Sequence, residues 1–269
     1  MTFKIISADE RLKEDHFVKG CIFGQSGVGK TTLIKGMSKE ALLVDMEAGD
    51  LTLADWKGDS IRIRDYEAMR DLACLIGGVN PSAASGETFS AEHYAEVEGK
   101  LGKRNEVLGK YQTIFIDSIT VLSRLGFVWA EQQPENIGRN GAKDTRGAYG
   151  LMGREIMKLL THLQHTRDKH IIFVGILDQK QDDFNRTFWK PQMEGAKVAN
   201  ELSGIVDLVL TMAFKTDPDS GKVYRVFYTS ADNEDGYPAK DRSGKLKPIE
   251  AANLQKIIDK IQSKEGVKT

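Results

Sequence analysis

A glycine-rich loop near the start of the chain carries the clearest chemical signal in the sequence. It has the spacing Gly-x-x-x-x-Gly-Lys-Thr and follows a short apolar run, residues 18–23. Such a loop points backbone N–H groups at phosphate oxygens, and the N-terminus of the next helix adds a positive field. We therefore predict a nucleoside triphosphate site. Its residues are Gly24, Gln25, Ser26, Gly27, Val28, Gly29, Lys30, Thr31 and Thr32.

The same loop predicts a magnesium site. Lys30 is expected to reach the β- and γ-phosphates, and the hydroxyl of Thr31 to ligate Mg²⁺. Asp117 closes a second apolar run, residues 113–117, which suits a carboxylate that holds the ion through water. The alternative is that Asp117 caps the helix expected to start at Ile119. With the phosphate loop present, we favour the metal role for Asp117.

Hydrolysis also requires a group that orients the attacking water. Ser118, and not a glutamate, follows Asp117, so this group must come from another strand. Glu47 comes just after the apolar run at 41–45 and is the best candidate for the general base. The alternative is an ordinary solvated carboxylate at a strand end.

Composition restricts the remaining classes of function. The 269 residues include 38 basic and 39 acidic side chains, so any contact with nucleic acid must be a local patch. The apolar runs are far shorter than the roughly 20 residues that a membrane span needs. With two cysteines and no pattern of a secretory leader, the expected compartment is the cytoplasm.

Apolar runs alternate with helical patterns along the chain, which predicts an α/β fold with a mainly parallel sheet. We expect one domain over 1–269, with a core at about 18–246 and a helical tail at 247–269. Strands are expected at 18–23, 41–45, 60–64, 113–117, 170–177, 205–212 and 223–228. Helices are expected at 30–39, about 91–109, 119 to about 132, a long stretch around 151–163, and 249–261. Residues 77–90 and 133–147 read as loops, and 178–200 as an irregular stretch.

Five motifs resemble a known family. They are the phosphate loop, Asp45-Met46-Glu47, Ile116-Asp117-Ser118, Arg146-Gly147-Ala148-Tyr149-Gly150, and Ala239-Lys240-Asp241-Arg242-Ser243-Gly244-Lys245-Leu246. Over about 18–246 the chain resembles the phage-encoded RecA-core ATPases, an AAA domain family of phage nucleotide-binding proteins. Some of these act in single-strand annealing and recombination.

The resemblance implies a RecA-like P-loop NTPase core, flanked by helices and ending in a C-terminal hairpin. It implies ATP as the nucleotide, with Glu47 as catalytic glutamate and Asp117 as the Walker B aspartate; the guanine motif Asn-Lys-x-Asp is absent. It also implies a host-cell cytoplasmic location for a phage protein. One departure is the strand end at 173–179, which lacks the family's usual Asn-Gln sensor and puts ATP-gated DNA binding in doubt.

Lys240 and Arg242 are one residue apart, so on an extended segment their side chains point the same way. RecA-like proteins use such a pair to reach the γ-phosphate of a neighbouring subunit, which implies a homo-oligomer with active sites completed in trans. The alternative is a basic turn in solvent.

Two segments have the composition of single-stranded DNA contacts, in which cations follow the backbone and aromatic rings stack on bases. Such a protein would work beside a single-strand binding protein. The leading prediction is an ATPase of phage-type recombination, and the alternative is a regulatory or assembly NTPase without DNA. The candidate DNA contacts are Arg139, Lys143 and Arg146 in the first segment, and Lys180, Arg186, Phe188, Trp189 and Lys190 in the second.

Overall fold

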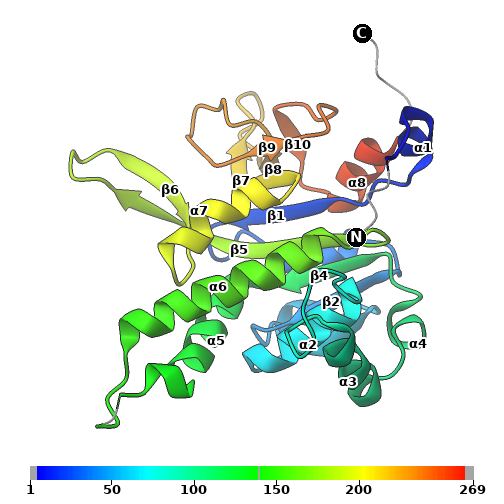
Figure 1. Cartoon of the computed structure of the whole chain (residues 1–269). Helices are drawn as coiled ribbons and strands as arrows, with labels where there is room; N and C mark the ends of the chain where they lie inside the picture. Colours follow the sequence, from blue (N-terminus) through cyan, green and yellow to red (C-terminus); the bar gives the residue numbers. More distant parts are fainter. Residues whose placement is uncertain (1–4, 139, 264–269) are drawn as a thin grey trace.

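The computed structural model describes residues 5–138 and 140–263 and shows a sheet with helices on both faces (Figure 1). The strands are β1 Lys19–Gly24, β2 Ala41–Asp45, β3 Asp59–Arg62, β4 Thr113–Asp117, β5 His170–Gln181, β6 Thr187–Pro191, β7 Leu208–Thr216, β8 Val223–Tyr228, β9 Lys240–Asp241 and β10 Ile249–Ala251. The α-helices are α1 Ala8–Lys13, α2 Tyr66–Gly77, α3 Ala91–Leu101, α4 Arg104–Leu108, α5 Ile119–Glu131, α6 Thr145–Gln164, α7 Ala196–Ile205 and α8 Leu254–Gln262. Short 3₁₀ helices are η1 Thr31–Gly36, η2 Asp50–Leu53 and η3 Pro134–Asn136.

The sheet is mixed but mostly parallel. Its strand order is β10-β8-β7-β1-β5-β4-β2-β3, with β6 paired to β5 and β9 to β7. Strands β7, β1, β5, β4, β2 and β3 run parallel, whereas β8 and β10 are antiparallel additions at one edge. The predicted parallel sheet and the C-terminal hairpin of β7 and β8 are thus confirmed.

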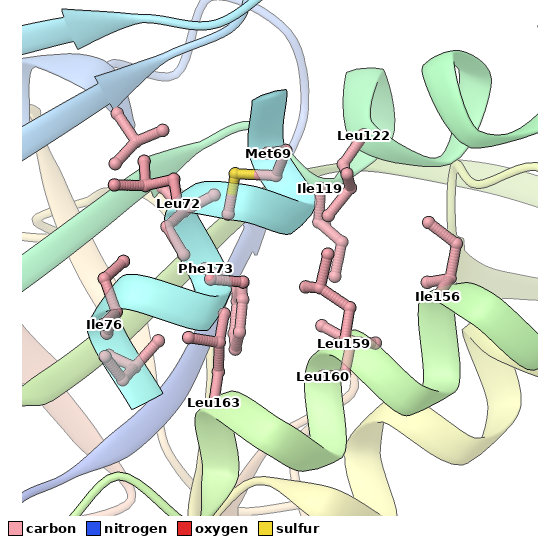
Figure 2. Packing of buried hydrophobic residues seen from close by; sticks show 14 of the residues in the cluster. Met69, Leu72, Ile76, Ile119, Leu122, Ile156, Leu159, Leu160, Leu163 and Phe173 are labelled. Carbon is pink, nitrogen blue, oxygen red and sulfur yellow. The ribbon is translucent and has the colours of Figure 1, made fainter. Parts of the chain in front are cut away.

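Alternate residues of the central strands pack into two separate hydrophobic clusters, one on each face of the sheet. Cys21 and Phe173 face a cluster formed with α2, α5 and α6, whereas Ile22 and Ile172 face a cluster formed with η1 and α8. Figure 2 shows the first cluster, where side chains of three helices meet Phe173 of the sheet. A strand buried on both faces needs a continuous apolar sequence, which is the pattern that made β1, β2, β4 and β5 predictable.

Several helices differ from the sequence prediction. The helix after the phosphate loop is the short 3₁₀ turn η1, which stops at Gly36 instead of reaching Lys39, since glycine and the following Ser38 both disfavour helix. The polar helix expected at about 91–109 is broken into α3 and α4 at Gly102, whose φ of +95° suits glycine. Helix α6 starts at Thr145, inside the predicted loop, with Asp144 as its N-cap.

The stretch expected to be irregular at 178–200 contains two regular elements. Strand β5 continues to Gln181 and pairs with β6 in an antiparallel hairpin that projects from the body (Figure 1). Helix α7 follows. The hairpin sequence is polar and mostly exposed and lacks an apolar alternation, although Trp189 near its base packs against the first cluster.

The C-terminal part contributes to the sheet and to the second core. Strand β10 pairs with β8, and Leu254, Ile257 and Ile258 of α8 are buried with η1. The expected helix at 249–261 is therefore a short strand followed by a helix. Within residues 5–138 and 140–263, no helix is long and apolar enough to cross a membrane.

Candidate active site

The carboxyl ends of three parallel strands converge on one site. Strand β1 leads into the phosphate loop, β2 ends at Asp45, and β4 ends at Asp117, which is the register partner of Asp45. Strand β5 lies between β1 and β4, yet Thr31 reaches across it: its Oγ1 donates a hydrogen bond of 2.5 Å to Oδ2 of Asp117. The loop and the candidate metal carboxylate are therefore in direct contact.

Lys30 lies inside the phosphate loop. Its Nζ donates hydrogen bonds of 2.9 Å to the carbonyl oxygens of Gly24 and Gln25. Burial lowers the pKa of Lys30, and the nearby carboxylates of Asp117 and Glu47 partly oppose this shift. Because those carboxylates favour the charged ammonium, Lys30 supplies a partly buried cation next to the loop.

Asp117 is buried, with 4% of its surface exposed. Burial raises its pKa to about 6, the hydrogen bond from Thr31 lowers it, and the charge of Glu47 raises it further. A cation beside this carboxyl would favour its ionised form. The peptide bond between Asp117 and Ser118 is cis.

A hydroxyl and a carboxylate oxygen are the donors that Mg²⁺ prefers, so Thr31 and Asp117 fit the predicted ion. In the described part of the chain, no group of three His, Cys, Asp or Glu side chains could form a complete metal site.

Glu47 is tied to the end of β4 through Ser118, whose Oγ donates a hydrogen bond to Oε1 of Glu47. Asp45 stabilises the turn that follows β2. Its Oδ1 accepts hydrogen bonds from the backbone N–H groups of Glu47 at 3.0 Å and Gly49 at 3.4 Å. The other oxygen of Asp45, Oδ2, is buried and has no hydrogen-bond partner among the residues that the structure describes. Glu47 itself is exposed.

Three residues of this site lay outside the predicted set. Asp45 and Ser118 stand within the motifs that flank Glu47 and Asp117, so their position in the sequence could have identified them. Arg225 of β8 gave no such signal, yet its guanidinium lies against Gly29 of the phosphate loop. Its placement depends on the register between β7 and β8, which the sequence does not specify.

Comparison with family models identifies the family of the chain. The model described as AAA domain matches residues 16–243, which include every strand end of the site. The chain belongs to the AAA domain family. A search of curated proteins gave no match.

Solved structures with a related architecture are distant from this AAA domain. A KaiC-like protein from the hyperthermophilic archaeon Pyrococcus horikoshii OT3 is 12% identical, with 81% of each chain covered and a TM-score of 0.39. A prototypical ATPase from the type III secretion system of pathogenic bacteria is 18% identical, with 73% of this chain covered and a TM-score of 0.39. The chain spans about half (51%) of that ATPase. The strand order and the phosphate loop of the chain itself give the AAA domain its RecA-like P-loop NTPase fold.

Lys240 and Arg242 of this AAA domain contact their own chain. Lys240 Nζ donates to the carbonyl oxygen of Ser203, while Arg242 donates to that of Gly204 at 2.9 Å and pairs with Asp207 at 3.1 Å. Both cations therefore lie at the C-terminal end of α7, where a helix attracts positive charge. The two side chains point the same way, as expected. To act in a neighbouring active site, they would have to break their bonds to Ser203, Gly204 and Asp207 and bind the neighbour's phosphate instead.

The two candidate DNA segments leave the same side of the AAA domain (Figure 1). Lys143 pairs with Glu131 at 3.2 Å, Lys180 with Asp178 at 3.7 Å, and Arg186 with Asp182 at 2.8 Å. Phe188 and Arg146 are exposed, and Lys190 is half-buried. Arg139 lies outside the described residues.

Trp189 has a structural contact that competes with a stacking role. Its Nε1 donates to the carbonyl oxygen of Asp235 at 3.0 Å, and its ring lies 4.9 Å from that of Tyr237. It therefore anchors the base of the hairpin to the segment that follows β8.

A cavity of about 1410 Å³ lies apart from the phosphate loop, along α6. Its walls are α6, the segment after α2 and the start of α7, and no residue of the loop lines it. The candidate active site of this AAA domain is therefore identified by its residue chemistry and not by cavity size.

Proposed function

We propose that this protein binds Mg-ATP at the phosphate loop and hydrolyses it. The observation that carries the proposal is the contact of Thr31 with Asp117 at the carboxyl ends of the parallel strands, with Glu47 held beside them through Ser118. The residues to which we assign the phosphate cradle, the magnesium ligands and the base therefore lie together.

Each residue then has a role in phosphoryl transfer to water. Backbone N–H groups of the loop and the ammonium of Lys30 bind the phosphates. Mg²⁺ held by Thr31 and Asp117 would neutralise charge on the β- and γ-phosphate oxygens. Glu47 orients a water molecule and accepts its proton as the oxygen attacks the γ-phosphorus, and ADP leaves.

The variant Glu47→Gln tests the hydrolytic part of the proposal. It should abolish turnover while nucleotide binding persists, because the amide cannot accept the proton. Glu106→Gln is the matched control, since Glu106 is exposed on α4, away from the three strand ends. Unchanged turnover in Glu47→Gln would remove the assignment of Glu47.

We further propose that the ATPase acts on single-stranded DNA in phage-type recombination or annealing. The support is the pair of basic and aromatic segments on the side where the strands end, with Phe188 44% exposed at the hairpin. Steady-state ATP hydrolysis should rise with single-stranded DNA at low salt, and the rise should fade at moderate salt as phosphate contacts are screened.

A regulatory or assembly NTPase without DNA is the second candidate. The net charge of −1 and the carboxylate partners of Lys143, Lys180 and Arg186 favour it, because paired cations offer less charge to a phosphate backbone. ATP binding without any stimulation by DNA would select this function.

A further inference from the structure

Arg225 reaches the phosphate loop because of the sheet register. Strand β7 runs beside β1, with Thr211 opposite Phe23 near the end of β1. Strand β7 then continues past this point, and β8 returns along it with Arg225 opposite Phe214. Arg225 therefore stands beyond the end of β1, at the level where the chain has turned into the loop.

The guanidinium group of Arg225 lies directly on the backbone of Gly29. A Cβ atom at Gly29 would be 2.9 Å from both Cζ and Nη1 of Arg225, and 3.3 Å from Nη2. Gly29 also has a φ of +98°, which other residues rarely adopt. The glycine thus allows the arginine to approach the residue that precedes Lys30.

This guanidinium is held without a counter-charge. The residues that the structure describes give it no carboxylate partner, and its ring contact is Phe214, 5.9 Å from Cζ to the centroid. Arg225 is exposed, so its N–H donors are open to a ligand. Lys30, in contrast, already donates to two carbonyl groups of the loop.

We propose that Arg225 is a nucleotide-binding residue that contacts phosphate oxygens from the same chain as the loop. The inference rests on the proposed function, since it assumes that the loop holds a nucleotide. Gly29 belongs to the segment whose N–H groups are expected to face the phosphates. The guanidinium of Arg225, which lies next to Gly29, is therefore within reach of the same phosphate oxygens. Lys30 and Arg225 then hold the phosphates from two elements, the loop and the edge hairpin.

Binding of a fluorescent ATP analogue with Mg²⁺, and its displacement by inorganic tripolyphosphate, tests this role. Arg225→Ala should weaken the affinity for both probes by about tenfold, the usual worth of a hydrogen bond to a charged group. Arg225→Lys should recover part of the loss, because it keeps the charge but not the fork. Lys222→Ala is the matched control: it removes an exposed cation from the turn before β8 and should leave both affinities unchanged.

The outcomes separate this inference from the proposed function. If the wild-type protein binds both probes and Arg225→Ala binds them equally well, Arg225 has no role in binding and only this inference is overturned. If Arg225→Ala loses affinity for the ATP analogue but not for tripolyphosphate, Arg225 does not contact the phosphates and stacks on the base instead. Failure of the wild-type protein to bind either probe would overturn the proposed function, and this inference with it.

Discussion

The hydroxyl of Thr31 donates a 2.5 Å hydrogen bond to Oδ2 of Asp117, 86 residues away in the chain. The contact joins the phosphate loop to β4 across the intervening strand β5. It also makes the protonation of Asp117 relevant to magnesium, because only the ionised carboxylate binds a cation well.

Acid should weaken Mg-nucleotide binding through Asp117. The pKa of its carboxyl is raised to about 6, mainly by burial, so the group becomes protonated as the pH falls through that value. Affinity for Mg-ATP should then drop by up to about tenfold per pH unit below about pH 6. A titration with a fluorescent ATP analogue between about pH 5 and about pH 7.5 measures this.

Asp117→Asn serves as the control for that titration. The variant should bind Mg-ATP more weakly at neutral pH, and its affinity should follow only the titration of the nucleotide and of other groups. The ratio of wild-type to variant affinity should therefore shrink as the pH falls. A ratio independent of pH would show that Asp117 does not titrate in this range.

Ser118→Ala should reduce turnover more than nucleotide binding. Ser118 donates to Glu47 and also caps α5 by accepting from the N–H of Val121 at 3.3 Å. Without the hydroxyl, Glu47 loses its hydrogen bond to the N-cap of α5. The free energy of unfolding should fall by about 1 kcal/mol, the usual cost of a lost cap. Steady-state ATPase assays and urea unfolding measure the two effects.

Asn253→Ala separates the two consequences of the serine variant. Asn253 caps α8 by accepting from the N–H of Lys256 at 3.0 Å, on an element outside the active site. It should lose similar stability and keep full turnover. Equal turnover in the serine and asparagine variants would argue against a positioning role for Ser118.

Much of the site could be predicted because its chemistry depends on local spacing. Strands β2 and β4 are apolar runs that end in a carboxylate, so Asp45 and Asp117 could be placed at the same sheet edge. The phosphate loop is a contiguous motif. These features need no knowledge of distant contacts.

Contacts that depend on register and local packing could not be predicted. Arg225 contacts Gly29 because β8 pairs with β7 in one register. Lys240 contacts Ser203 of α7 because β9 pairs with the start of β7, the strand that follows α7. The β5–β6 hairpin was missed for a different reason, since its mostly exposed residues carry no apolar alternation. Tertiary pairing decided the contacts of Arg225 and Lys240, whereas the local sequence obscured the hairpin.

Lys240→Ala and Arg242→Ala should lower turnover without weakening nucleotide binding, if these cations complete a neighbouring site. Mixing either variant with Lys30→Ala subunits should then restore some activity, because each chain supplies what the other lacks. ATPase assays of the mixtures, at fixed total protein, measure the rescue.

Lys245→Ala is the matched control, because its Nζ donates to the carbonyl oxygens of Ile261 and Ser263 at the end of α8. It removes another cation of the same motif that is bound to a helix end. If mixing restores no activity, and the loss of turnover is explained by the loss of folded protein, Lys240 and Arg242 only cap α7.

His162 should make the fold sensitive to acid. Its ring stacks on Phe89 at 3.9 Å, its Nε2 is buried with no hydrogen-bond partner in the described part of the chain, and burial lowers its pKa to about 4. The unfolded chain binds a proton near pH 6.5, so between about pH 6.5 and about pH 4 it holds more protons than the folded state. Stability must therefore fall as the pH falls through this window.

His162→Leu should remove this contribution, which reaches about 1.4 kcal/mol per pH unit within the window. His170, buried with its pKa also near 4, adds a slope of the same sign, whereas the raised pKa of Asp117 adds one of opposite sign. The test is therefore the difference in slope between wild type and variant, from urea unfolding at several pH values. His16→Leu changes an exposed histidine and should keep the wild-type slope; the same slope in His162→Leu would show that His162 is not kept neutral by the fold.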